Sequence, residues 1–93
     1  MRNFSPEDRL SRTRGLLSTE LDQETVLMSI DAGAYYGLAG VARKIWQELE
    51  KPTSFSELVD CLEKEYRVSH EACIADVQKF LTEIEREGLL RVE

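Results

Sequence analysis

Three side chains could carry nucleophilic, acid–base or metal chemistry: Cys61, Cys73 and the single histidine, His70. Neither cysteine has a second cysteine or a histidine at the short spacing that zinc sites use. His70 has Ser69 and Glu71 as chain neighbours and no evident partner that would orient it as a general base. These residues predict two structural thiols and a solvated histidine at the start of a helix, with no bound metal or cofactor.

The remaining candidates for chemistry are the many carboxylates, which fall at positions expected on the polar faces of helices. Asp60 and Lys64 stand four residues apart, a spacing that suits an ion pair within one helix. The sequence has no glycine-rich phosphate loop and no nucleophile elbow. We therefore expect a protein that is not an enzyme.

The net charge of −6 is unevenly distributed along the 93 residues. Residues 1–14 hold 4 arginines against 2 acids, so the remaining 79 residues hold 8 basic and 16 acidic side chains. Nucleic-acid binding draws much of its affinity from Lys and Arg that neutralise phosphates. The acidic charge of residues 15–93 therefore predicts that the partner is not a nucleic acid.

No apolar run is long enough to cross a bilayer, and the first residues lack the apolar segment of a secretion signal. These features predict a cytoplasmic protein without a membrane partner, in a compartment where thiols stay reduced.

The chain divides into an arm, a β half and an α half. Residues 1–14 show no sustained periodicity and contain Pro6, which predicts a flexible basic arm ahead of one domain over residues 15–93. Strand-forming residues occupy three runs separated by polar turns, the second of which contains Gly33. These runs are residues 16–21, 25–30 and 34–38, and in the second run Val26, Met28 and Ile30 alternate onto one face. The pattern predicts an antiparallel three-stranded meander.

Apolar residues then recur at spacings of three and four over residues 40–50, 54–66 and 69–87, which predicts three helices. The first ends ahead of Pro52, the second begins with a capping box at Ser54, and the third begins at Ser69 and ends at Gly88. A short strand over residues 89–92 is expected to follow. The predicted fold is α+β and winged-helix-like, with the meander followed by a three-helix bundle.

Three blocks of sequence occur in an order that points to one family. They are Tyr35-Tyr36-Gly37-Leu38 with Val41, Ile45-Trp46 and Leu49; Phe55-Ser56-Glu57-Leu58-Val59 with Leu62 and Tyr66; and Asp76-Val77, Phe80-Leu81, Ile84 and Gly88-Leu89-Leu90. Over roughly residues 24–92 this order resembles PqqD-like proteins, with their YYGLN-x-V-G-x-x-I-W-x-x-L block and their DV-x-x-FL-x-x-L-x-x-x-GLL ending. Ala39 replaces the family's usual Asn, which removes a cap of the first helix, and Ala42 replaces a Gly.

The resemblance implies a peptide-recognition element that is similar to a winged helix but does not bind DNA. Such domains capture the leader segment of a ribosomally made precursor peptide as a strand added beside the third strand, in a cleft against the third helix. They then present the precursor to a modifying enzyme. In lasso-peptide biosynthesis, the setting that we favour, the enzyme is a cysteine-protease leader peptidase. In pyrroloquinoline quinone and related pathways it is a radical SAM enzyme.

The predicted site combines an exposed strand edge with one helix face. Unpaired N–H and C=O groups at such an edge can template another strand, and Gly37 allows a close backbone approach. Tyr35 is the better contact candidate on this strand, because the alternating Tyr36 and Leu38 also suit an ordinary core. The peptide-binding residues that we expect are Tyr35, Tyr36, Gly37, Leu38, Ile74, Asp76, Lys79, Phe80 and Glu83.

The helix part of this set depends on the resemblance. Ala72, Asp76, Lys79 and Glu83 recur at helical spacing, which by itself also describes a solvated face. The family resemblance favours peptide contact for Asp76 and Lys79, with Phe80 or Ile74 as the wall of an apolar pocket. The arginines of the arm could pair with acidic leader residues or remain mobile.

Two other classes stay open. A winged-helix transcription factor would need exposed Lys and Arg on its recognition helix, yet residues 70–87 hold only Lys79 and Arg86 against 5 acids. A purely structural subunit, whose chemistry lies in another chain, is the third class. The edge of the third strand could also pair with its own copy in a dimer.

Overall fold

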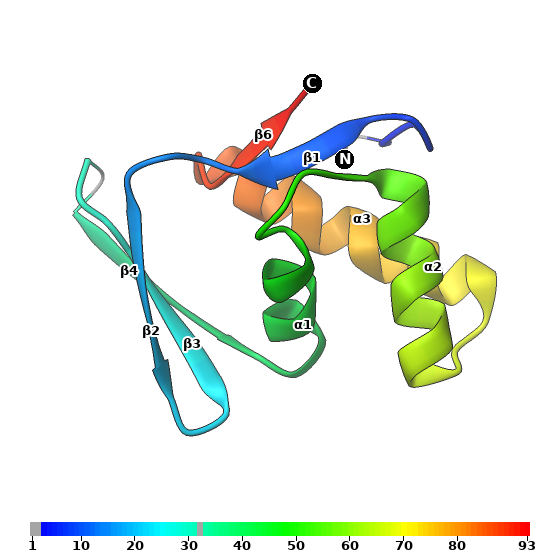
Figure 1. Cartoon of the computed structure of the whole chain (residues 1–93), viewed down its shortest axis with the longest axis horizontal. Coiled ribbons are helices and arrows are strands. Elements are labelled where there is room, and N and C mark those ends of the chain that lie inside the picture. The colour runs from blue at the N-terminus through cyan, green and yellow to red at the C-terminus, as the bar shows by residue number, and fades with distance from the viewer. Residues whose placement is uncertain (1–2, 32) are drawn as a thin grey trace.

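The computed structural model describes residues 3–31 and 33–93 and places two small sheets around three helices (Figure 1). The elements, in chain order, are β1 (Arg9–Arg12), β2 (Leu16–Leu21), β3 (Glu24–Ser29), β4 (Ala34–Ala39), α1 (Gly40–Glu48), β5 (Thr53–Ser54), α2 (Phe55–Tyr66), α3 (His70–Arg86) and β6 (Leu90–Val92). Met1 and Arg2 of the predicted arm and Ala32 of the predicted turn lie outside the described residues.

The predicted meander is confirmed: β2, β3 and β4 form one antiparallel sheet in that order. Its strands alternate between a face that turns toward the helices and a face that turns away, as the pleat requires. Leu27 of β3 is fully buried on the helix side, whereas Val26 and Met28 are half-buried on the opposite side. Ile30, predicted to continue their alternation, lies in the turn after β3.

Local chemistry explains where the helices begin. The Ser54 hydroxyl accepts a hydrogen bond from the Glu57 backbone N–H (3.1 Å), and Ser69 caps α3 by accepting from the Ala72 N–H (3.2 Å). At α1 the capping position is Ala39, which makes no side-chain hydrogen bond, in line with the missing Asn. Gly88 has a φ of 77° and ends α3 as predicted.

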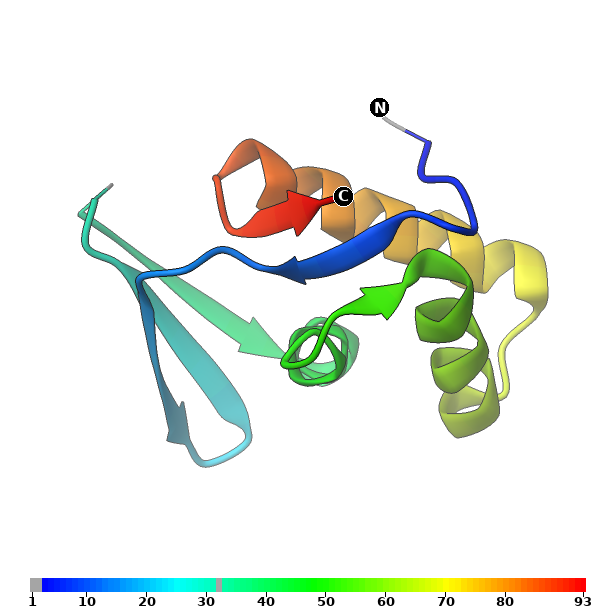
Figure 2. The same ribbon diagram turned by 45° about the horizontal axis from the view of Figure 1, so that its top comes forward.

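The core lies between the three helices, and a second sheet, with the strand order β5-β1-β6, covers one side of it (Figure 2). Trp46 of α1 is 2% exposed, and Leu58 of α2 and Leu81 of α3 are fully buried beside it in the same cluster. Leu27 and Leu38 are the meander residues buried in this cluster, and the half-buried Leu16 and Tyr36 pack against it. The meander is therefore attached to the helices mainly through two of its three strands, β3 and β4.

The prediction of a flexible arm is wrong for residues 9–12. They form β1, which pairs antiparallel with β5 on one side and β6 on the other (Figure 2). Leu10 is 0% exposed, and Phe4 stacks on Phe55 with ring centroids 5.9 Å apart. The sequence did not reveal β1 because a four-residue strand with one fully buried side chain is too short to show a hydrophobic period. The strands that pair with it also lie more than forty residues away along the chain.

Arg12 belongs to this structure rather than to a mobile arm. Its guanidinium lies 4.6 Å from the centre of the Trp46 ring and donates from Nε to the Trp46 carbonyl (3.1 Å). Partial burial lowers the pKa of Arg12. A cation above an aromatic face and hydrogen-bonded to a carbonyl fixes β1 against α1.

We expect Leu10→Ala to lower the free energy of unfolding by about 2–5 kcal/mol, because it removes a fully buried side chain and leaves a cavity. Urea denaturation followed by circular dichroism measures this change. Arg9→Ala, at the exposed neighbour, is the control and should change stability by less than about 0.5 kcal/mol. Wild-type stability in Leu10→Ala would mean that residues 9–12 are an arm after all.

Candidate peptide-binding cleft

The meander has two edge strands, β2 and β4, and in the part of the chain that the structure describes each of them pairs with β3 alone. The edge beside α3 is that of β4. In an antiparallel pair every second residue turns its N–H and C=O away from the neighbouring strand. Residues 34–39 therefore present a row of free donors and acceptors.

A cleft of about 410 Å³ lies between β4 and the C-terminal half of α3. Its lining consists of Tyr36, Gly37 and Leu38 of β4, Phe80, Glu83, Ile84 and Arg86 of α3, and Glu87 and Leu89 after α3. Leu38, Ile84 and Leu89 are buried and give the cleft an apolar floor. Acidic and basic side chains from the last turn of α3 form its rim.

Tyr36 and Glu87 join the two walls of this cleft. The Tyr36 hydroxyl donates a hydrogen bond to Oε2 of Glu87 over 3.1 Å. Partial burial and this carboxylate raise the pKa of Tyr36 above its ordinary value. The bond fixes the distance between the strand and the end of the helix.

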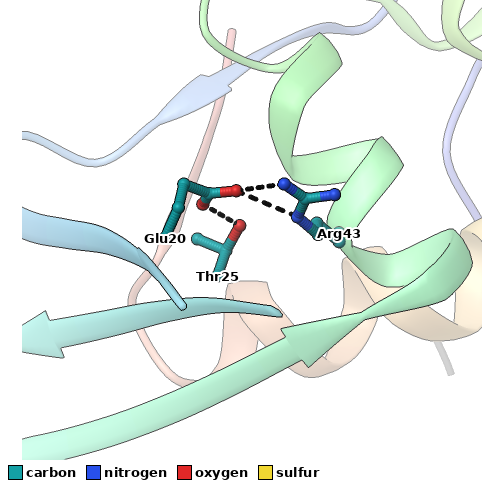
Figure 3. Close-up of polar contacts among 3 residues, drawn as sticks. All are labelled: Glu20, Thr25 and Arg43. Atoms are coloured by element: carbon teal, nitrogen blue, oxygen red, sulfur yellow. Dashed lines mark hydrogen bonds and ion pairs between the residues drawn. The ribbon is translucent and has the colours of Figure 1, made fainter. Parts of the chain in front are cut away.

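A second contact holds the meander against α1. Arg43 of α1 donates to Oε1 of Glu20 on β2, with Nε at 3.0 Å, and Thr25 of β3 donates to Oε2 of the same carboxylate (Figure 3). The hydrogen bonds from Thr25 and Arg43 lower the pKa of Glu20. This three-residue cluster adds a polar link between the sheet and α1 to the packing of Leu27 and Leu38 in the core.

A second cavity, of about 170 Å³, lies on the same side of α3. Asp76 and Val77 line it, and they precede Glu83 and Ile84 of the cleft by two helical turns, or roughly 10 Å. The other residues around it are apolar or weakly polar: Val41, Leu62, Tyr66, Val68 and Cys73. Val41 and Tyr66, which the sequence placed on apolar stripes, are 43% and 39% exposed here.

The structure brings part of the predicted set together at the cleft: Tyr36, Gly37, Leu38, Phe80 and Glu83. Asp76 lines the second cavity instead.

Three predicted residues lie elsewhere. Tyr35 is 70% exposed on the face of β4 that turns away from the cleft, and the exposed Lys79 lines neither cavity. Ile74 lines another cavity together with Pro6 and Phe55. It precedes Phe80 by six residues, and this spacing turns the two side chains about a third of a turn apart around α3.

Sequence reasoning missed four residues of the cleft, namely Ile84, Arg86, Glu87 and Leu89. Helical spacing could have identified Ile84 and Arg86 of α3, since Ile84 follows Val77 by seven residues and Arg86 follows the predicted Glu83 by three. Glu87 and Leu89 depend on how the chain turns after α3, which no spacing indicates.

The residues first considered for chemistry lie apart from the cleft. Nδ1 of His70 is 2.8 Å from Oε1 of Glu63, a partner that the sequence did not suggest. Cys73 is buried and Cys61 half-buried, and both are free thiols. Among the described residues, no three His, Cys, Asp or Glu side chains are grouped so that they could hold a metal ion. No helix in the described part of the chain is long and apolar enough to span a membrane.

An open-edged meander beside the last helix of a three-helix bundle defines a winged-helix-like domain with a cleft at a strand edge. Residues 24–90 match the family described as coenzyme PQQ synthesis protein D (PqqD). The chain therefore belongs to the PqqD family, and the resemblance drawn from its motifs is confirmed. No curated protein sequence matches it.

Two solved structures share the fold. TbiB1 in complex with the TbiA(beta) leader peptide is 31% identical, with a TM-score of 0.81 over 87% of this chain and 94% of TbiB1. Lasso peptide synthetase B1 complexed with the leader peptide is 22% identical, with a TM-score of 0.78 over 88% of this chain and 96% of that chain. The predicted α+β winged-helix-like fold is confirmed by these similarities.

We expect the contribution of Glu20 to stability to disappear in acid. A carboxyl whose folded-state pKa lies below its ordinary value of 4.5 stabilises the fold above that value, and the stabilisation is lost as the pH falls through the lowered pKa. Glu20→Gln should therefore melt below the wild type at pH 7, and the difference between the two melting temperatures should shrink as the pH falls below 4.5 and through the lowered pKa of Glu20. Thermal melts by circular dichroism across this range measure the gap.

Asp22→Asn is the matched control, because Asp22 is an exposed acid in the next turn and forms no ion pair in the described part of the chain. Its melting temperature should follow the wild type at every pH. Equal melting temperatures of Glu20→Gln and the wild type at pH 7 would show that the carboxylate does not stabilise the fold.

Proposed function

We propose that this protein is a non-catalytic adaptor that binds the leader segment of a ribosomally made precursor peptide and delivers it to a modifying enzyme. The observation that carries the proposal is the free edge of β4 alongside an apolar-floored cleft. TbiB1, which is 31% identical, was solved with a leader peptide. That similarity supports the same class of ligand here.

The leader would bind as a strand added to β4. Backbone hydrogen bonds at the edge supply affinity without reading sequence, and alternate leader side chains point toward α3. An apolar side chain that reaches the cleft would pack on Leu38, Phe80 and Ile84. Full burial of one such side chain is worth about 1.5–3 kcal/mol.

Charge at the cleft would add selectivity. Glu83 and Glu87 stand against Arg86 at its rim, and Asp76 lines the second cavity. This surplus of acids favours a leader with basic or neutral residues beside its apolar anchor. A leader that continues along the same side of α3 would meet the second cavity next.

Delivery would follow from tethering rather than from catalysis, since a bound precursor is held at high effective concentration near the adaptor's partner. We favour a lasso-peptide pathway in the cytoplasm, with a cysteine-protease leader peptidase as partner, because both similar structures carry leader peptides and one is a lasso peptide synthetase component. A chaperone for a radical SAM enzyme in pyrroloquinoline quinone or related peptide biosynthesis is the second candidate, which the family description favours.

Isothermal titration with a synthetic leader peptide, encoded beside the gene of this protein, tests the proposal. We expect saturable binding near 1 μM, or about −8 kcal/mol. Phe80→Ala and Glu83→Lys should each weaken it by roughly tenfold or more, because the first removes a cleft wall and the second reverses a rim charge. Gln78→Ala, on the far side of α3, is the control and should bind as the wild type does.

Absence of leader binding by a folded, monomeric wild type would remove the adaptor function. Tight binding of duplex DNA at physiological salt would favour the winged-helix transcription-factor class instead.

Strand addition has its own test in the ligand. A series of leader peptides, each with one N-methylated amide, should lose affinity at every second position along the segment that pairs with β4. The alternation arises because only every second amide of an edge strand faces its neighbour. Equal losses at adjacent positions, or no losses, would show that the leader binds without joining the sheet.

A further inference from the structure

The meander has a second, unpartnered surface that turns away from the helices. Leu17, Met28 and Tyr35 are direct cross-strand neighbours on it, one from each strand. Leu17 is 53% exposed and Tyr35 is 70% exposed. We define the outer face as these three residues together with Leu21 and Val26 on the same side of the sheet, and Ile30 in the adjoining turn.

The outer face is distinct from the leader-binding cleft. Side chains alternate along a strand, so Tyr35 points away from the cleft to which its neighbours Tyr36 and Leu38 contribute. Of the 7 large apolar side chains that are exposed in the described part of the chain, 4 belong to the outer face. Exposed apolar side chains gathered on one face, as Leu17 and Tyr35 are on either side of Met28, are typical of a protein interaction site.

Charge around the outer face restricts what can cover it. Residues 16–39 contain Glu20, Asp22, Glu24 and Asp31 and no Lys or Arg. Glu20 pairs with Arg43, whereas Asp22 and Glu24, at the end of the β2–β3 hairpin, form no ion pair in the described part of the chain. A second copy of this chain, with its own net charge of −6, is a poor match for this acidic end.

The outer face also continues into the proposed leader site. A strand added at the edge of β4 would place every second leader side chain on the same face of the sheet as Tyr35. A partner that covers the outer face would therefore touch the adaptor and the bound leader together.

We propose that the outer face docks the enzyme that receives the peptide, through an apolar patch flanked by Lys or Arg on that enzyme. This inference rests on the proposed adaptor function. It gives the two partners separate surfaces, with the leader at the edge and cleft of β4 and the enzyme on the exposed face of the same sheet.

The experiment titrates the purified leader peptidase encoded beside the gene into this protein, and the leader peptide separately. Leu17→Ser combined with Ile30→Ser should weaken peptidase binding by roughly tenfold or more and leave the leader affinity unchanged. Asp22→Lys should weaken peptidase binding in the same direction, with a smaller salt dependence than the wild type shows. Val68→Ser is the matched control, because Val68 is 45% exposed but lines the second cavity, so peptidase binding should be retained.

Peptidase binding that is unchanged in the double variant, or absent with the wild type, overturns the docking proposal. So does a wild-type dimer in sedimentation velocity that the double variant converts to a monomer, because the occupant is then a second copy. Each of these results can occur with leader binding intact, which separates them from failure of the adaptor function itself.

Discussion

The structure depends on how the meander is held against the helices, because β4, the edge strand beside α3, is hydrogen-bonded to a neighbouring strand on one side only. β4 runs directly into α1, and the meander contributes mainly Leu27 and Leu38 to the buried core. Beyond them, the Glu20 carboxylate accepts hydrogen bonds from Thr25 and Arg43 (Figure 3). The Tyr36 hydroxyl also donates to Glu87 at the end of α3. Both polar contacts lie on the side of the meander that faces the helices, next to the strand that forms one wall of the cleft.

An open edge is normally a hazard, since any extended chain can pair with it. Here α3 stands beside the edge, so an incoming strand must also fit the Phe80 wall and the charges of Glu83 and Glu87. On the other side of the strand, a Cβ at Gly37 would collide with the Glu24 carboxylate, which leaves a negative charge close to the backbone of β4. The same elements that create the cleft therefore limit what can join the sheet.

Much of the fold follows from local chemistry that the sequence states directly. Ser54 and Ser69 begin their helices, Ala39 leaves α1 uncapped, and three alternating runs form the meander. β1 could not be predicted in this way, because its only deeply buried side chain, Leu10, is packed by strands from the middle and the end of the chain.

At the site, the β4 residues were predictable because an edge strand is defined by its neighbours in sequence. The α3 residues were less so, because the helix face that turns toward β4 depends on tertiary packing. Ile74 and Ile84 are the same residue type on the same helix, but only Ile84 lies on that face.

The pairing of β1 with β6 brings the two ends of the described chain together. Arg9 and Glu93 exchange backbone hydrogen bonds of 3.2 and 2.8 Å, far from the β2–β3 hairpin tip (Figure 1). The first and last strands of the domain thus lie side by side, an arrangement of the kind that tolerates circular permutation.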